Sequence, residues 1–242
     1  MITVLDDGAG RPDLAVRREL KFVFQDSEVA SLRRLLESSC RPIRYAGPVS
    51  TVRSIYFDDP RMRDCYANYD GVGARQKTRL RWYDRETPTD RFFVEVKWRR
   101  HRACGKHRAL VTAVDSLGEM PYRSLLRALR RDLPAPYQER LARDAEPIVM
   151  VEYRREHFAL RDGAGRLTLD YDLRFYPQRG RARFGRRFGA SLPGVTIVEL
   201  KTAADDERPI PRLLAPLKPR EARFSKYVCG SQILGYVKES QA

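Results

Sequence analysis

Cysteine and histidine are scarce in this chain of 242 residues, and their few positions show no metal-ligand pattern. The four cysteines are scattered without a C-x-x-C pair, and the three histidines have no ligand spacing. The sequence therefore contains no zinc site of the usual kind, and its cysteine usage favours a reducing compartment.

Long apolar runs are also absent. No stretch approaches the roughly 18 to 20 apolar residues of a membrane helix, and Met1–Val16 lacks the basic and then apolar segments of a secretory signal. A loop of the form G-x-x-x-x-G-K-[ST] is missing too, since Gly71 and Gly73 give only a G-x-G fragment typical of a turn. These absences argue against a membrane-spanning protein and a P-loop nucleotide-binding protein.

Positive charge is what the sequence has in excess. Lys and Arg number 47 against 32 Asp and Glu, which gives a formal net charge of +15. With 33% charged and 42% hydrophobic residues, the chain is too apolar for disorder and too polar for a membrane protein. We expect one domain over residues 16–242 after a loose segment, 1–15. The charge favours an anionic partner, and a solvated basic surface is the equal alternative.

Residue patterns predict both helices and short strands. Ser27 suits an N-cap for a helix over Glu28–Ser38, and further helices are expected over Tyr122–Leu133, Gln138–Arg143 and Ser225–Val237. Eight strands are expected from alternation and from β-branched and aromatic residues: Val16–Phe24, Thr51–Phe57, Lys77–Tyr83, Phe92–Arg99, Lys106–Val111, Ile148–Arg155, Arg166–Tyr171 and Val195–Lys201. Because they do not alternate regularly with helices, we predict an α+β fold: a closed antiparallel β-barrel with helices packed on its outside.

Charged residues occupy alternate positions on five of these strands. In Lys77–Tyr83, the side chains of Lys77, Arg79 and Arg81 share one face of the predicted strand. The same alternation joins Arg17 with Glu19 and Lys21, Glu95 with Lys97, Lys106 with Arg108, and Glu199 with Lys201. For any single strand, a charged face turned to water is the ordinary interpretation.

Five such strands change the interpretation. If the sheet closes, their charged faces point inward and repel one another unless anions or a metal ion compensate. We therefore expect a tunnel that binds polyanions, with carboxylates that hold a divalent cation. A nucleic-acid partner is not expected, because the aromatic residues mostly fall on faces opposite the basic ones, where they cannot stack on bases.

Eight short motifs carry a resemblance to a known family. They are Arg17–Lys21, Ser54–Asp58, Arg79–Tyr83, Val94–Lys97, Tyr153–Arg155, Arg166–Asp170, Val198–Lys201 and Phe224–Tyr227. In order and spacing they resemble the VTC domain, the polyphosphate polymerase domain of the triphosphate tunnel metalloenzyme (CYTH-like) superfamily. The resemblance runs from about Arg17 to Tyr236, which is nearly the whole chain.

The resemblance implies a metal-dependent transferase. Its tunnel would hold ATP and a growing inorganic polyphosphate chain, with Mn²⁺ or Mg²⁺ as cofactor, and would move the γ-phosphate of ATP onto that chain. By motif, the implied catalytic residues are Arg79, Arg81, Lys97 and Lys226. Further phosphate contacts would be Lys21, Lys106, Arg155, Arg166, Arg223 and Ser225, and the metal ligands would be Glu199 first, then Glu19 and Glu152.

Two other functions stay open. CYTH-type triphosphatases and class IV adenylyl cyclases begin with E-x-E-x-K, but Arg17 stands at the place of the first Glu, which favours the VTC branch over an inorganic or nucleoside triphosphatase. A non-catalytic polyphosphate-binding module would use the same tunnel. The family's polymerase domains often work beside membrane subunits, so we expect a cytoplasmic protein with, at most, a separate membrane partner.

Three local points also stay open. Alternation places Arg154 on the face of Glu152, whereas the family motif points to Arg155 beside Tyr153. Glu95 and Glu19 suit internal salt bridges to Lys97 or Lys21 as well as metal binding. The basic stretch 179–189 is expected to be a mobile loop.

Overall fold

The computed structural model describes residues 2–6, 17–26, 28–86, 91–101, 103–113, 119–163, 165–203 and 221–237. Eleven strands form one antiparallel sheet. They are β1 (Ile2–Asp6), β2 (Arg17–Gln25), β3 (Cys40–Ile43), β4 (Ser50–Asp58), β5 (Ala74–Tyr83), β6 (Arg91–Arg100), β7 (Ala103–Ala113), β8 (Glu146–Leu160), β9 (Gly165–Pro177), β10 (Ala190–Leu192) and β11 (Val195–Ala203). The helices are α1 (Val29–Ser39), α2 (Arg63–Tyr69), α3 (Tyr122–Asp132), α4 (Ala135–Arg143) and α5 (Lys226–Ile233).

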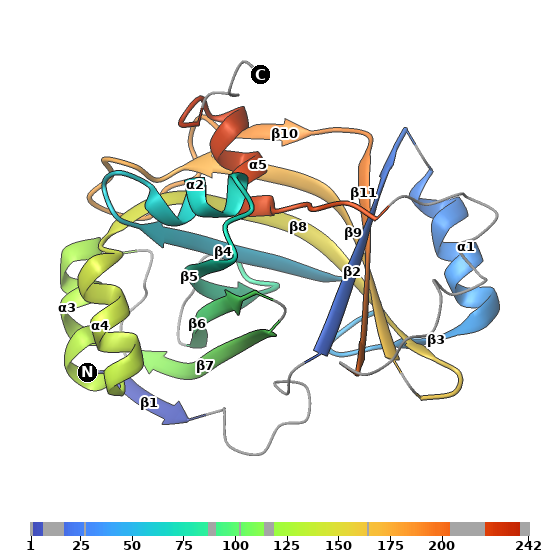
Figure 1. Ribbon diagram of the computed structural model, residues 1–242, viewed down its shortest axis with the longest axis horizontal. Coiled ribbons are helices and arrows are strands. Elements are labelled where there is room, and N and C mark those ends of the chain that lie inside the picture. The colour runs from blue at the N-terminus through green and yellow to red at the C-terminus, as the bar shows by residue number, and fades with distance from the viewer. Residues whose placement is uncertain are drawn as a thin grey trace.

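The sheet runs in the order β1-β7-β6-β5-β4-β8-β9-β11-β2, with β10 beside β9 and β3 beside β8. It is strongly curved, so that β2, β9 and β11 stand steeply across the direction of β4 to β7 (Figure 1). The long strands β8 and β9 take part in both halves and carry the bend. The α+β class and the antiparallel sheet agree with the sequence prediction.

The predicted closed barrel is wrong, because the two edges that would meet have other partners. β1 pairs with β7 over Ala109–Ala113. The outer edge of β2 pairs with a segment close to the C-terminal end: the Ala222 amide donates to the Lys21 carbonyl at 2.8 Å, and Glu221 bridges to Phe22. Within the described residues, no backbone ladder therefore joins β2 to β7.

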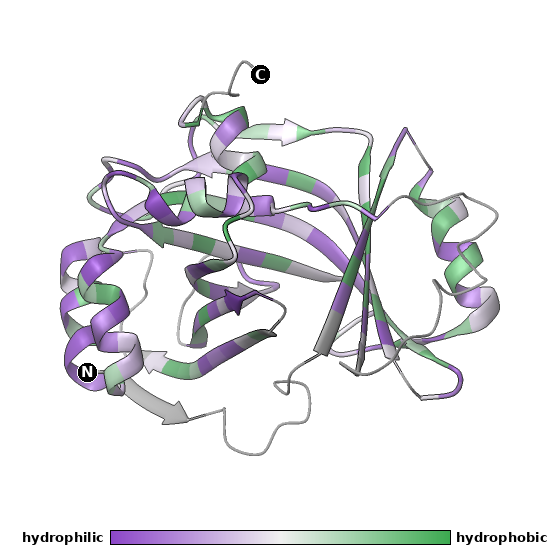
Figure 2. Ribbon diagram, viewed as in Figure 1, coloured by the Kyte–Doolittle hydropathy of each residue, from purple (hydrophilic) through white to green (hydrophobic). Residues whose placement is uncertain are grey.

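Hydrophobic and hydrophilic residues alternate along β4 and β8 (Figure 2). Apolar side chains pack in clusters on the convex face of the sheet. One cluster packs α3 and α4 against β5, β6 and β7, with Leu80, Trp82, Phe92 and Leu129 fully buried. A second packs α1 against β2, β9 and β11. Each fully buried side chain of this size contributes about 1.5–3 kcal/mol. Burial of one face forces the alternate charged positions onto the concave face.

Helix α5 lies on the concave face instead. Its Tyr227 ring stacks on Tyr56 of β4, with centroids 4.9 Å apart and planes 5° from parallel. Val228 and Tyr227 join a core with strands β4, β8 and β9. The helix therefore fills part of the space inside the curve and brings its N-terminal residues next to the charged strand faces.

The eight predicted strands and the four predicted helices are present, while α2, β1, β3 and β10 were not predicted. Ser27, the expected N-cap, lies outside the described residues. The stretch 179–189 is irregular but tied down, since Gln178 donates to the Gly185 carbonyl at 2.7 Å and Arg186 pairs with Glu152. None of the described helices has the length and apolar character needed to cross a membrane.

Candidate functional site

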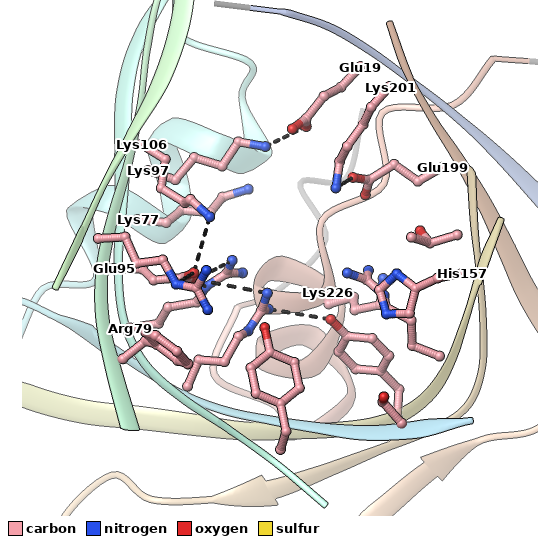
Figure 3. Close-up of a pocket in the computed structure, with 18 of the residues that line it drawn as sticks. Glu19, Lys77, Arg79, Glu95, Lys97, Lys106, His157, Glu199, Lys201 and Lys226 are labelled. Atoms are coloured by element: carbon pink, nitrogen blue, oxygen red, sulfur yellow. Dashed lines mark hydrogen bonds and ion pairs between the residues drawn. The ribbon is translucent and has the colours of Figure 1, made fainter. Parts of the chain in front are cut away.

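A cavity of about 790 Å³ lies within the curve of the sheet. Eleven lysine and arginine side chains and four acidic ones line it: Lys21, Lys77, Arg79, Arg81, Lys97, Lys106, Arg108, Arg155, Arg166, Lys201 and Lys226, with Glu19, Asp84, Glu95 and Glu199. Figure 3 shows the labelled side chains projecting into this space from opposite walls. So large an excess of enclosed positive charge is suited to a multivalent anion.

The first wall consists of β5, β6 and β7, whose register arranges the charges in layers. Lys77, Lys97 and Lys106 lie side by side across the three strands. The next layer holds Arg79, Glu95 and Arg108 in the same way. Because each layer differs by two residues along every strand, all these side chains point to the same face.

Glu95 is the anionic centre of this wall. It is 1% exposed and lies 2.6 Å from Arg79, 3.3 Å from Lys106, 3.5 Å from Arg108 and 3.8 Å from Arg81. Burial raises its pKa, but these four cations hold it well below its usual range. Glu95 is thus an internal salt-bridge residue, paired with cations other than Lys97, and no side remains open for a metal ion.

The second wall consists of β9, β11 and β2, and there acidic and basic residues alternate. Glu199 lies opposite Lys21 and Lys201 opposite Glu19 in the β11–β2 register. Lys201 pairs with Glu199 at 2.6 Å, and Lys97 reaches across from the first wall to Glu19 at 2.5 Å. This last ion pair links β6 with β2 where no backbone ladder does.

Both carboxylates of the second wall are ionised at neutral pH. Burial and the nearby Glu199 raise the pKa of Glu19, but Lys97, Lys201 and Lys21 together lower it to about 2. For Glu199, burial is outweighed by Lys201 and Lys21, so its pKa falls well below the usual range. Two charged carboxylates therefore face the cavity from neighbouring strands.

Strand β8 forms the floor of the cavity, and of its two neighbouring arginines, Arg154 and Arg155, only Arg155 faces inward. Arg155 is 9% exposed, lines the cavity and donates to both oxygens of Asp170, at 2.6 and 2.7 Å. Arg154 points away, with a side chain 60% exposed, beside Asp172. Tyr153 and His157 share the face of Arg155 because they are two residues away. Burial and Arg155 lower the pKa of His157 to about 4, which keeps it neutral.

The N-terminus of α5 completes the lining. Ser225 is its N-cap and accepts from the Val228 amide at 3.4 Å, and it also accepts from Lys77 at 2.9 Å. Lys226 pairs with Asp170 at 2.7 Å, and its ammonium lies 4.6 Å from the Tyr153 ring centre. The helix thus ties the first wall to the floor.

The lysines are held in an environment that disfavours their charge. Burial and repulsion by Lys21 and Lys97 lower the pKa of Lys77 well below its usual range. Burial also lowers the pKa of Lys21, although Glu199 opposes it. Burial lowers the pKa of Lys106 to about 8. An anion bound in the cavity would relieve all three shifts.

All the predicted site residues except Arg223 and Glu152 line this cavity. Arg223 is exposed and borders a second cavity. Glu152 is wrong as a metal candidate: it projects from the other face of β8, where it pairs with Arg53 at 2.5 Å and with Arg186 at 3.1 Å. Strand alternation explains this, because Glu152 is an odd number of residues from Arg155. The roles of the other residues stay predictions.

Several residues that line the cavity, or hold the side chains that line it, were not among the predicted site residues. Lys77, Arg108 and Lys201 stand on the alternating charged faces, so the pattern already contained them. Asp170, which is 0% exposed and holds Arg155 and Lys226, belongs to the motif Arg166–Asp170. Asp170 meets Arg155 because β9 pairs with β8, and the alternation pattern of a single strand does not predict that pairing.

A separate acidic cluster lies at the end of β4, between α2, α4 and α5. One oxygen each of Asp58, Asp64 and Asp144 lies within 4.8 Å of the others, close enough for a metal ion. However, Arg143 donates to both oxygens of Asp64 at 3.0 Å, and Arg140 pairs with Asp64 and with Asp144. Arginines thus pair with two of the three carboxylates. Asp58 instead accepts from the Cys65 amide and the Tyr227 hydroxyl, and burial raises its pKa to about 6.

Comparison with known proteins gives one match of sequence. The family model described as VTC domain matches residues 16–235. The comparison with curated proteins found no match. Among solved structures, HpAC1 from Hippeastrum, named as an adenylyl cyclase and described as having a dominant triphosphatase activity, is similar to 92% of this chain and 98% of its own. Its identity is 15% and its TM-score 0.40, which support no conclusion about this chain. The family model spans nearly all the strands that build the cavity, and the chain belongs to the VTC domain family.

Proposed function

We propose that this protein is a metal-dependent polyphosphate polymerase that transfers the γ-phosphate of ATP to an inorganic polyphosphate chain. The observation that supports this most is the layered set of cations facing the ionised Glu199 and Glu19 in one enclosed cavity, in a chain of the VTC domain family. Handling of a triphosphate or polyphosphate follows from that family; polymerisation is our inference.

The residues of the first wall would hold the phosphates in line. Arg79 and Arg81 offer planar pairs of N–H donors to phosphate oxygens, while Lys77, Lys97 and Lys106 add point charge. Their neighbour Glu95 fixes the guanidinium groups before substrate arrives. Phosphoryl transfer depends mainly on such positioning and on electrostatic stabilisation, so no side-chain nucleophile is needed.

Glu199 and Glu19 suit a divalent cation. They project from adjacent strands, and both are ionised. The charge of Glu199 raises the pKa of Glu19, and a cation between the two carboxylates would relieve this repulsion. Mg²⁺ and similar ions are commonly held by one or two carboxylates together with substrate phosphate oxygens. Bound there, Mn²⁺ or Mg²⁺ would neutralise phosphate charge as a Lewis acid.

In the proposed reaction, an oxygen of the terminal phosphate of the growing chain attacks the γ-phosphorus of ATP. The bond between that phosphorus and the β–γ bridging oxygen breaks, and ADP leaves. Arg155, Arg166 and Lys226 would hold the attacking chain against the floor and the second wall. The enclosure limits water, which would otherwise attack and release free phosphate.

The test is product formation by purified protein supplied with ATP and Mn²⁺. Polyphosphate on a gel is the expected product, together with ADP. Free phosphate without chain growth would instead identify a triphosphatase, and neither product, with tripolyphosphate still bound, would identify a binding module.

Glu199→Ala tests the role of the main carboxylate. We expect turnover to fall by about 100-fold or more because the cation loses a ligand, while binding of polyphosphate is largely kept. Glu86→Gln, which changes a carboxylate that is 81% exposed, is the matched control. Unchanged turnover in Glu199→Ala would remove this residue from the metal site.

A further inference from the structure

A second cavity of about 570 Å³ adjoins the first. Seven residues line both cavities: Glu19, Lys21, Lys77, Lys97, Cys104, Phe224 and Ser225. Three of them are lysines. Six basic side chains line the second cavity against two acidic ones, Glu19 and Glu221. The excess of positive charge thus continues beyond the site described above.

Three arginines are specific to this second space: Arg75, Arg99 and Arg223. Arg75 of β5 lies directly opposite Arg99 of β6 in the ladder. Arg223 approaches from the segment before α5, and its Nη1 lies close to the Cα of Gly71, where a Cβ would be 3.0 Å away. A turn and two strands therefore bring three guanidinium groups to one opening.

The guanidinium groups of Arg75 and Arg99 donate to main-chain carbonyls. Arg75 donates to the Val72 carbonyl at 2.6 Å, and Arg99 donates to the His101 carbonyl at 2.9 Å. In the described part of the chain, none of the three forms an ion pair with a carboxylate. Burial and repulsion by Arg99 and Arg223 lower the pKa of Arg75. Like charges directly opposite in a ladder destabilise it unless an anion lies between them.

We propose that the arginine cluster Arg75, Arg99 and Arg223 is a second anion site that holds the distal phosphates of a polyphosphate chain whose end lies in the first cavity. This inference deepens the proposed function and rests on it for the direction of the chain. If the proposal holds, the second cavity contributes to the binding of long polyphosphate chains but not to the binding of triphosphate.

The strand geometry supports a continuous path. Arg75, Lys77, Arg79 and Arg81 are alternate residues of β5 on one face, and at about 3.3 Å per residue they span about 20 Å. Three linked phosphates do not reach along that row, whereas a longer chain does. Lys77 and Lys97 lie opposite each other in the ladder and line both cavities, so cations border the proposed path where the two sites adjoin.

The experiment compares two probes, sodium tripolyphosphate and long-chain polyphosphate, in binding to the full chain. The double variant Arg75→Ser/Arg223→Ser should lose about 10-fold or more of its affinity for the long chain and keep that for tripolyphosphate. Arg127→Ser/Arg130→Ser, on the exposed face of α3, removes the same charge elsewhere and should change neither. Arg223→Ser alone, an exposed position, should give a smaller loss in the same direction if the double variant folds poorly.

If neither affinity changes in the double variant, the inference is overturned. An equal loss of affinity for both probes would also overturn it and would assign the arginines to the first cavity. Turnover of ATP separates this result from the proposed function. A chain-length effect in a protein that makes no polyphosphate would support the second site and contradict the polymerase.

Discussion

The cavity and the acidic cluster at the end of β4 are both buried and highly charged, yet they differ in balance. In the cluster, Asp58, Asp64 and Asp144 are matched by arginines and main-chain amides, as when the Cys65 amide donates to Asp58 at 2.8 Å. In the cavity, eleven cations face four carboxylates, and burial together with repulsion by neighbouring cations lowers the pKa of Lys77 and of Lys106.

We infer from this difference that the cluster serves the fold and that the cavity binds an external ion. A balanced cluster recovers its desolvation cost within the protein, whereas an unbalanced one stays costly until an external ion binds. Distance alone would have favoured the acidic cluster as the ion site, since its oxygens are the closer set. Charge balance points to the cavity.

The largest effect is expected from Glu95→Gln. This change leaves four cations around a neutral side chain that is 1% exposed, so we expect a loss of about 4 kcal/mol in the free energy of unfolding. Denaturant unfolding measures it. Saturating tripolyphosphate should restore part of the loss, because the anion replaces the missing charge. A loss that tripolyphosphate cannot reduce would contradict the view of the cavity as an anion site.

Asp144→Asn makes the corresponding change in the acidic cluster. Asp144 is 0% exposed and pairs with Arg140 at 2.8 Å and Arg143 at 3.1 Å, so we expect a loss of about 3 kcal/mol. Tripolyphosphate should give this variant no more added stability than it gives the unchanged protein, and turnover per folded molecule should stay the same. Asp132→Asn, in an exposed pair with Arg131, is the control. Loss of turnover in a folded Asp144→Asn protein would mean that the cluster takes part in catalysis.

Lys77→Met should raise stability and weaken binding at once. The free energy of unfolding at pH 7 should rise by about 1 kcal/mol as repulsion is removed, while tripolyphosphate affinity falls about 10-fold. Because the folded pKa of Lys77 lies below its unfolded value, its destabilising effect is full below the folded pKa and fades as pH rises toward the unfolded one. The stability gained by Lys77→Met should fade in the same direction. A variant less stable than the unchanged protein would show that the bond to Ser225 outweighs the repulsion.

The smallest effect is proton uptake on binding. The pKa of Lys106 is about 8 because of burial, and a bound anion raises it, so tripolyphosphate binding near pH 8 should take up a fraction of a proton from this group. Affinity should accordingly decline as pH rises past 8. Calorimetry in two buffers of different ionisation enthalpy measures the uptake. Lys106→Arg should reduce it, since arginine stays protonated; the same uptake in this variant would assign the protons to other groups.

Strand alternation predicted most of the site. Six basic residues on the charged faces of β5, β6 and β7 line the cavity, because a helix or the core covers each apolar face. They are Lys77, Arg79, Arg81, Lys97, Lys106 and Arg108. Arg166, Glu199 and Lys201 followed the same rule on β9 and β11. The amino-acid sequence alone therefore predicts which face of a strand each side chain occupies.

The amino-acid sequence alone does not predict which side chains of different strands form ion pairs. Glu95 is surrounded by four cations from the two neighbouring strands β5 and β7 rather than paired with Lys97. Glu19 instead forms an ion pair with Lys97 across the cavity. Aromatic residues were expected opposite the basic ones, yet Tyr56, Tyr83, Phe93 and Tyr153 also line the cavity. The barrel closure failed for the same reason, because it depends on which segments occupy the outer edges of β2 and β7.

The unpaired seam between β2 and β7 has a mechanical consequence. A closed barrel takes its radius from strand number and shear, so it cannot widen without breaking a ladder. Here the sheet is a strip, and the ion pair of Lys97 and Glu19 joins β6 to β2 across the cavity. Among the described residues, the width of the cavity at this point therefore depends on the length of two side chains rather than on a backbone ladder.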